Sequence, residues 1–171
     1  ASDVYKRQVL MGCFGIFPAK RYTKFISWDI LITIACALAI SRAMVNSGLA
    51  DFIAAHVIDF ANGVSPWTVL VVLYITTNII TELITNNAAA AFAFPIAMSA
   101  AQQLGVDPMP FFVAICIASS ASFSSPIGYQ TNLIVQGIGN YRFKDFVRVG
   151  LPLNIITFVL SIVLIPLFWD F

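Results

Sequence analysis

Two runs of polar, helix-breaking residues interrupt long hydrophobic segments of this chain. The first is Thr85-Asn86-Asn87, and the second extends from Ser122 to Asn132 and contains Pro126 and Gly128. At membrane depth, backbone outside a helix is tolerated only where it is buried in protein or lines a wet cavity. Paired breaks of this kind are typical of the substrate and ion site of a secondary transporter. The pattern therefore predicts part of a membrane carrier.

Composition assigns the chain to the integral membrane proteins. Of its 171 residues, 60% are hydrophobic and 10% are charged, and the mean hydropathy is +0.90. A soluble domain carries about 25% charged residues, so we expect the lipid bilayer to be the main partner. The net charge of +1 provides no basic face of the kind that nucleic acid requires. We therefore expect no nucleic-acid partner.

The first part of the chain divides into three segments. Residues 1–8 are polar and join abruptly to an apolar run, so we interpret them as non-native or junctional sequence. Residues 9–27 are interpreted as the end of a truncated helix and a basic loop, because the apolar run is shorter than the ~20 residues of a membrane span. Residues 28–64 are predicted to form a spanning helix, Trp28–Val45, and then an interfacial helix, Leu49–Ala61.

Residues 65–139 are predicted to form a re-entrant hairpin and a broken helix. The hairpin helices are expected at Pro66–Ile84, with Ser65 as N-cap, and at Ala88–Leu104. Two full spans are the alternative. Charge asymmetry does not separate the two topologies, because both place the two basic clusters on the same side of the membrane. These clusters are Lys20, Arg21 and Lys24, and Arg142, Lys144 and Arg148. The broken helix is expected to be helical at Pro110–Ala121, irregular at Ser122–Gln130 and helical again at Thr131–Ile138.

Residues 140–171 are predicted to form a basic interfacial segment, residues 140–150, and a final spanning helix, Pro152–Trp169. With this segment, the predicted fold class is an all-α membrane protein of spanning helices, a re-entrant hairpin and a broken helix.

The first break has the chemistry of an anion site. The Thr85-Asn86-Asn87 run precedes a predicted helix, and the first amides of that helix, expected at Ala88–Ala91, have no intrahelical partner. The second break has the chemistry of a cation site, because free carbonyls of unwound backbone suit a sodium ion. Gly128 permits unusual backbone angles there, and the Gln130 amide is a candidate substrate contact, while Thr131-Asn132 opens the following half-helix. The alternative is that these polar residues only cap and join helices.

Glu82 lies well inside an apolar segment, and an intramembrane carboxylate is a functional-site hypothesis by default. Two interpretations stay open. Glu82 neutralises a coupling cation or accepts a transported proton, or it braces the hairpin by accepting hydrogen bonds from backbone amides at the tip.

An enzyme is not indicated. The chain has a single histidine, His56, in a segment away from both breaks. Its three cysteines lie far apart without a C-x-x-C spacing, so we expect buried, isolated thiols. Neither a hydrolytic triad nor a metal site other than one for sodium is predicted, and no cofactor is expected.

Several motifs together resemble the divalent-anion:sodium symporter family of sulfate and di- or tricarboxylate carriers. They are Thr81-Glu82-Leu83-Ile84-Thr85-Asn86-Asn87-Ala88, Pro95-Ile96, Ser125-Pro126-Ile127-Gly128-Tyr129-Gln130-Thr131-Asn132 and Arg148-Val149-Gly150-Leu151-Pro152-Leu153-Asn154. Members carry Ser-Asn-Thr at two hairpin tips, and Thr85-Asn86-Asn87 keeps only the asparagine of the second. Tyr129-Gln130-Thr131-Asn132 departs from the Thr-Pro-Pro-Asn of dicarboxylate carriers and resembles the branch carrying potassium-uptake-regulator-type domains, whose better known members move sulfate.

The resemblance implies a C-terminal fragment, one half of an inverted-repeat transporter that works by elevator-type displacement against a homodimeric scaffold in the bacterial inner membrane. It implies sodium as the coupling ion and a small divalent anion, sulfate or a di- or tricarboxylate, as the substrate. The implied substrate contacts are Thr85, Asn86, Asn87, Gln130, Thr131 and Asn132, and the implied sodium contacts are Thr81, Asn86, Gly128 and Asn132. The alternative is a proton-coupled or arsenite-type permease, or a channel of related fold.

Overall fold

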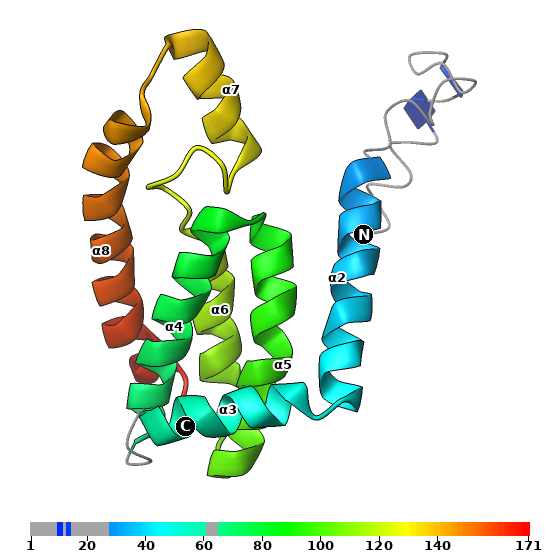
Figure 1. The fold of residues 1–171 in the computed structure, drawn as a ribbon, viewed down its shortest axis with the longest axis vertical. Coiled ribbons are helices and arrows are strands. Elements are labelled where there is room, and N and C mark those ends of the chain that lie inside the picture. The colour runs from blue at the N-terminus through cyan, green and yellow to red at the C-terminus, as the bar shows by residue number, and fades with distance from the viewer. Residues whose placement is uncertain (1–9, 12, 15–27, 61–64) are drawn as a thin grey trace. The chain divides into compact units, whose positions relative to one another are not determined.

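A computed structural model describes residues 10–11, 13–14, 28–60 and 65–171. All regular secondary structure among these described residues is helical, and no strand occurs in them. The chain separates into two compact units, Ala1–Thr33 and Ile34–Phe171. The helices that carry both breaks belong to the second unit (Figure 1). The segments predicted for residues 1–8 and for most of 9–27 lie outside the described residues.

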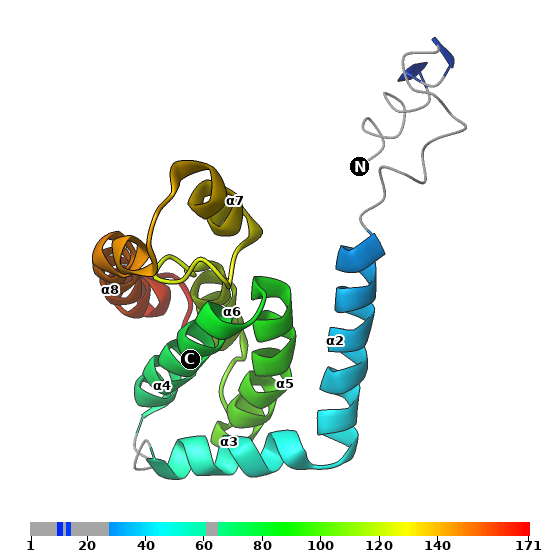
Figure 2. The ribbon, with the colours of Figure 1, turned by 45° about the horizontal axis from the view of Figure 1, so that its top comes forward.

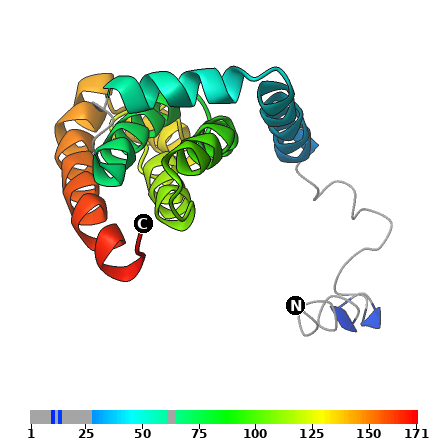
Figure 3. The same cartoon turned by 90° about the horizontal axis from the view of Figure 1, so that it is seen from below.

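Helices α2 (Trp28–Asn46) and α3 (Leu49–Phe60) lie close to the bounds predicted for the two helices of this part of the chain. Between Ile34–Asn46 and Leu49–Asp59 the axis bends by 75°. Gly48 makes the bend possible, since its φ of +74° is a conformation that residues with a side chain rarely adopt. Helix α3 consequently runs across the α4–α6 bundle rather than along it (Figures 1 and 3).

Helices α4 (Pro66–Leu83) and α5 (Asn86–Leu104) lie side by side and antiparallel (Figures 1 and 2). Ser65 is the N-cap of α4, as predicted: its hydroxyl accepts from the amide of Trp67 at 3.3 Å. Helix α5 begins at Asn86, two residues before the predicted start, because Thr85 takes the N-cap position and its carbonyl accepts from the Ala89 amide at 2.9 Å. The first break is therefore confined to Ile84 and Thr85.

The second break separates α6 (Met109–Ser120) from α7 (Gln130–Gly139), close to the predicted bounds. Helix α8 (Phe143–Phe168) differs more, since it begins nine residues before the predicted start at Pro152. The Asp145 carboxylate accepts from the Arg142 amide at 2.8 Å, which stabilises a helical first turn in the basic segment. The residues around Arg148 are thus the first turns of α8 rather than a separate interfacial segment.

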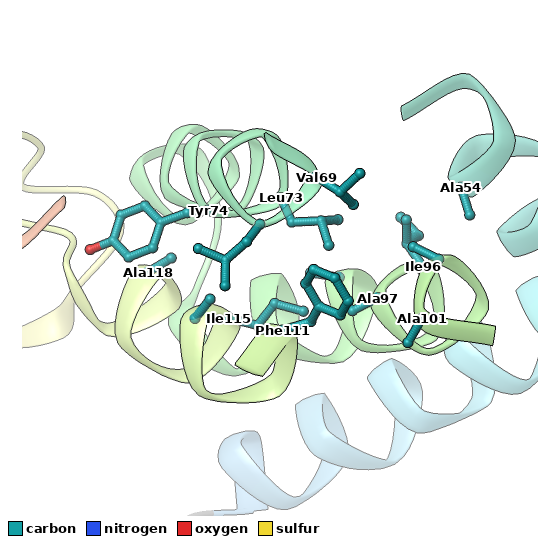
Figure 4. Close-up of a cluster of buried hydrophobic side chains, with 14 of the residues drawn as sticks. Ala54, Val69, Leu73, Tyr74, Ile96, Ala97, Ala101, Phe111, Ile115 and Ala118 are labelled. Atoms are coloured by element: carbon teal, nitrogen blue, oxygen red, sulfur yellow. The ribbon is translucent and has the colours of Figure 1, made fainter. Parts of the chain in front are cut away.

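An apolar core joins α3, α4, α5, α6 and α8. Helix α5 contributes small residues, among them the fully buried Ala97 and Ala100, which allow neighbouring helices to approach closely. Phe111 and Ile115 of α6 fill the space between them (Figure 4). The core lies between the helices below the two breaks, as Figure 1 is drawn.

Two described helices, Pro66–Leu83 and Phe143–Phe168, are long and apolar enough to cross a membrane. The bent pair Ile34–Asn46 and Leu49–Asp59 is a third candidate if it forms one span. Much of α8 outside the core exposes large apolar side chains, including Ile155, Val159 and Val163. The apolar face of α8 suits contact with lipid as well as with protein.

The three cysteines are free and exposed, so the expectation of buried thiols was wrong.

Candidate functional site

The two breaks, 30 or more residues apart in the sequence, meet at the side chain of Asn86. One end of its amide group lies 2.9 Å from Thr81 Oγ1, 3.2 Å from Ser119 O and 3.3 Å from Gly128 O. Because all three neighbours are oxygens, we assign the amide nitrogen to this end, where it donates to them. The hydroxyl of Thr81 donates in turn to Ser119 O at 2.6 Å. We call this cluster the Asn86 junction.

Gly128 is required by the packing of the junction. A Cβ atom at this position would collide with the carbonyl oxygen of Thr81 and with Ser122 Oγ. The Ser122 hydroxyl itself donates to Thr81 O at 3.2 Å. The last turn of α4 and the second break are therefore in direct contact, with no space for an additional methyl group.

Two other asparagines stabilise the irregular backbone of the second break. Asn132 of α7 donates to Ser122 O at 3.0 Å and to Ser125 O at 3.1 Å. Asn78 of α4 donates to Ala118 O at 3.3 Å and to Ala121 O at 2.8 Å. Because α6 ends at Ser120, none of these carbonyls is followed by the helical amide donor four residues on, although Ala118 O also accepts from the Ala121 amide at 3.2 Å. The side-chain amides take the place of the missing backbone donors.

The carboxylate of Glu82 contacts a different set of residues from the hydroxyl of the neighbouring Thr81. Its Oε1 accepts from the backbone amide of Ser124 at 3.0 Å and from Asn154 Nδ2 of α8 at 2.7 Å. Asn154 Nδ2 also lies 2.9 Å from Ser124 Oγ and donates to it. The carboxylate thus accepts from the backbone of the second break and not from amides at the hairpin tip, which one of the two open interpretations had assigned to it.

The remaining predicted site residues lie at the edges of the breaks. Thr85, Asn87 and Thr131 are exposed, and Gln130 is the first residue of α7. Because α5 begins at Asn86, its unpaired amides are those of Asn86, Asn87 and Ala88, so that of the predicted range Ala88–Ala91 only Ala88 is among them. The structure therefore brings Thr81, Asn86 and Gly128 together and leaves the other predicted contacts around them.

Sequence reasoning missed Ser119, Ser124 and Asn154 as members of these clusters. Asn154 carried a usable signal, since it is an asparagine within the apolar run of the last span. Ser119 carried none, because it contributes its backbone carbonyl.

A cavity of about 380 Å³ lies beside the second break and α8, and its lining includes Asn132 and Gly150.

A helical membrane protein in which two interrupted helices meet through polar side chains and free carbonyls has the architecture of a secondary transporter. The comparison with protein families agrees: the chain belongs to the citrate transporter family, which matches residues 8–170. It is thus a member of a transporter family and not of an enzyme family.

Individual relatives support this assignment. The chain is 38% identical over 161 residues to an uncharacterized transporter of Synechocystis, covering 94% of this chain and 26% of that protein. It is 39% identical over 147 residues to sodium/sulfate cotransporter 1 of Chlamydomonas reinhardtii, with shares of 85% and 17%. It is 28% identical over 142 residues to the sodium-dependent dicarboxylate transporter SdcS of Staphylococcus saprophyticus, with shares of 83% and 27%. The chain therefore spans only a small part of these proteins.

Proposed function

We propose that the protein to which this chain belongs is a sodium-coupled secondary transporter of a divalent anion, and that the Asn86 junction is one of its sodium sites. The observation that carries the proposal is the convergence of Thr81 Oγ1, Ser119 O and Gly128 O on one end of the Asn86 amide. These oxygens come from the last turn of α4, the end of α6 and the second break, so an ion bound among them would link these three segments to the start of α5.

The geometry of the junction supports a site with two states. Without a cation, the Asn86 amide nitrogen donates to the three oxygens. If the amide turns over, its oxygen joins them and four oxygens face one another at spacings of 2.9–3.3 Å around Asn86. Such a cluster is unfavourable unless a cation lies within it, and hard cations prefer oxygen ligands. Asn132, the fourth predicted sodium contact, would act by holding the backbone of the second break in place.

The start of α5 supports the anion site. The unpaired amides of its first turn and the helix dipole favour a negative charge, and the exposed side chains of Thr85 and Asn87 lie beside them. On the other break, Gln130 and Thr131 open α7. We assign these residues to substrate contacts, with Asn86 and Asn132 between the anion and the sodium ion.

Sulfate is the first candidate for the anion. The relatives at 38–39% identity include proteins named sodium/sulfate cotransporters, whereas the dicarboxylate transporter SdcS is 28% identical. The three residues Tyr129-Gln130-Thr131, which replace Thr-Pro-Pro of the dicarboxylate motif ahead of Asn132, favour the same choice. They also support placing the chain in the branch that carries potassium-uptake-regulator-type domains.

For the architecture we propose one half of an inverted-repeat transporter in the bacterial plasma membrane. Helices α4 and α5 would form a re-entrant hairpin with its tip at Ile84–Thr85, and α6 and α7 a broken helix. The hairpin and the broken helix would move together, in an elevator-type displacement, against the scaffold of a homodimer. The support for a scaffold contact is the row of exposed apolar side chains on α8.

Uptake into proteoliposomes tests the proposal. The full-length protein would be reconstituted with radiolabelled sulfate or succinate outside, with and without a sodium gradient, as wild type and as Asn86→Ala. We expect sodium-driven uptake of one anion, and its loss in the variant. Uptake that is indifferent to sodium and to Asn86 would instead indicate a proton-coupled or arsenite-type permease, or a channel.

A further inference from the structure

Two buried oxygen atoms at the contact between Glu82 and Asn154 have no hydrogen-bond partner among the described residues: Glu82 Oε2 and Asn154 Oδ1. They belong to two side chains that already touch, since Asn154 Nδ2 donates to Glu82 Oε1 at 2.7 Å. Asn154 is 8% exposed. A buried polar atom without a partner costs free energy, and a buried charge costs more. Because the two side chains are in contact, one ligand lying between these atoms would satisfy both.

The charge of Glu82 restricts what that ligand is. The donors to its Oε1 are the amide of Ser124 and the amide of Asn154, and both are neutral. A water molecule can donate to both free oxygens, but it leaves the carboxylate uncompensated. A monovalent cation would be coordinated by both oxygens and would also balance the single negative charge. Because both ligands are hard oxygens, a small alkali cation fits better than a soft metal.

We propose that Glu82 and Asn154 form a second cation site, specific for a small monovalent cation and separate from the Asn86 junction. Glu82 Oε2 and Asn154 Oδ1 are its protein ligands. This inference rests on the proposed function for the choice of sodium as the cation. The site is distinct because Thr81 contacts Ser119 and Asn86, whereas the next residue, Glu82, contacts Ser124 and Asn154.

The position of this site gives it a role that the Asn86 junction does not have. It ties α4 and the second break to α8, through Ser124 and Asn154. Gly150, one turn earlier on α8, lies so close to the Phe123 carbonyl that a Cβ atom would collide with it. Occupancy by a cation therefore strengthens the contact between the broken helix and α8, and loss of the cation weakens it.

Equilibrium binding of radioactive sodium to the purified full-length protein tests the proposal. The variants are Glu82→Gln, which removes the charge with little change in shape, and Asn154→Leu, which removes the second ligand. Asp59→Asn is the matched control, since it removes an exposed carboxylate on α3. We expect both site variants to bind one sodium ion fewer per protomer than wild type at saturation, and the control to bind the same number.

The outcomes separate the two proposals. If the wild type binds sodium and Glu82→Gln binds the same number of ions, the second site is wrong and the sodium-coupled function stands. If the wild type binds no sodium, the coupling ion of the proposed function is wrong, and with it this site. Should Glu82→Gln fail to fold, Glu82→Asp keeps the charge on a shorter side chain, and its affinity for one sodium ion should fall by about tenfold, or 1.4 kcal/mol. An unchanged affinity in Glu82→Asp would overturn the second site.

Discussion

The two ends of α4 show how differently a helix terminus can be stabilised. At the amino end, Ser65 caps the first turn through an amide two residues away, and Pro66 takes a position where no backbone donor is needed. At the carboxyl end, Asn78, Thr81 and Glu82 contact residues that are 38 to 72 positions away. The Ser65 cap at the first end is a local structure, whereas the second end is a junction that brings separate segments together.

If the carboxyl end of α4 depends on close contact between distant segments, Gly128→Ala should cause the largest loss of stability and transport. The added methyl group would collide with the Thr81 carbonyl and with Ser122 Oγ. We expect a loss of about 3 kcal/mol in stability, at the upper end of the cost of overpacking, and loss of sodium-driven uptake. The measurement is thermal unfolding of the purified full-length protein. Gly137→Ala is the control, because a Cβ there meets nothing within 4 Å. Equal melting temperatures for the two variants would contradict the close contact.

Asn86→Ala should have the next largest effect. It removes the group that donates to Thr81 Oγ1, Ser119 O and Gly128 O and leaves buried acceptors unsatisfied. We expect about 2 kcal/mol of destabilisation, together with loss of the protection that sodium gives against thermal unfolding.

Asn87→Ala sharpens this prediction, since Asn87 is adjacent but exposed. Its stability should change by less than about 0.5 kcal/mol, with sodium protection retained and affinity for the anion reduced. A stability loss as large as that of Asn86→Ala would show that the junction extends beyond the residues assigned to it.

Asn78→Ala tests the same end of α4 one turn earlier. Its amide donates to the carbonyls of Ala118 and Ala121 at the end of α6, and Ala118 O accepts in addition from the Ala121 amide. We expect a loss of about 1.5 kcal/mol, measured as a lower melting temperature, with the sodium dependence of uptake unchanged. The exposed Gln102 provides the control substitution, Gln102→Ala, which should change the melting temperature little. If sodium protection also disappeared in Asn78→Ala, the capping contact and the ion site would not be separable.

The contrast between the two ends also explains how much the sequence could predict. Ser65 and Pro66 follow a local rule, and so does Gly105, whose left-handed φ of +68° ends α5. Helix bounds for α2, α3, α4 and α6 were accordingly close. The start of α8 was placed too late, since Pro152 was interpreted as a beginning although it lies inside the helix.

The site was only partly predictable for a related reason. Asn86, Gly128 and Thr81 could be named because breaks in apolar runs are visible in a sequence. Ser119 could not, because its contribution to the site is a backbone carbonyl that became available where α6 ended. The hydrogen-bond partners of Glu82 also depend on how α8 packs against the second break, and no local sequence pattern encodes that packing.

The smallest effect is expected at the amino end of α4, from Ser65→Ala. The Ser65 hydroxyl accepts a single hydrogen bond, from the Trp67 amide at 3.3 Å, and an N-cap serine contributes about 0.5–1 kcal/mol. The end is also anchored from a distance, because Trp67 Nε1 donates to Ile162 O of α8 at 3.3 Å. Loss of the cap should therefore lower the melting temperature slightly and leave sodium-driven uptake unchanged. Ser65→Asp keeps a capping group and should restore the stability. A loss of transport in Ser65→Ala would mean that the two ends of α4 are coupled, and that the distinction between a local terminus and a functional junction does not hold.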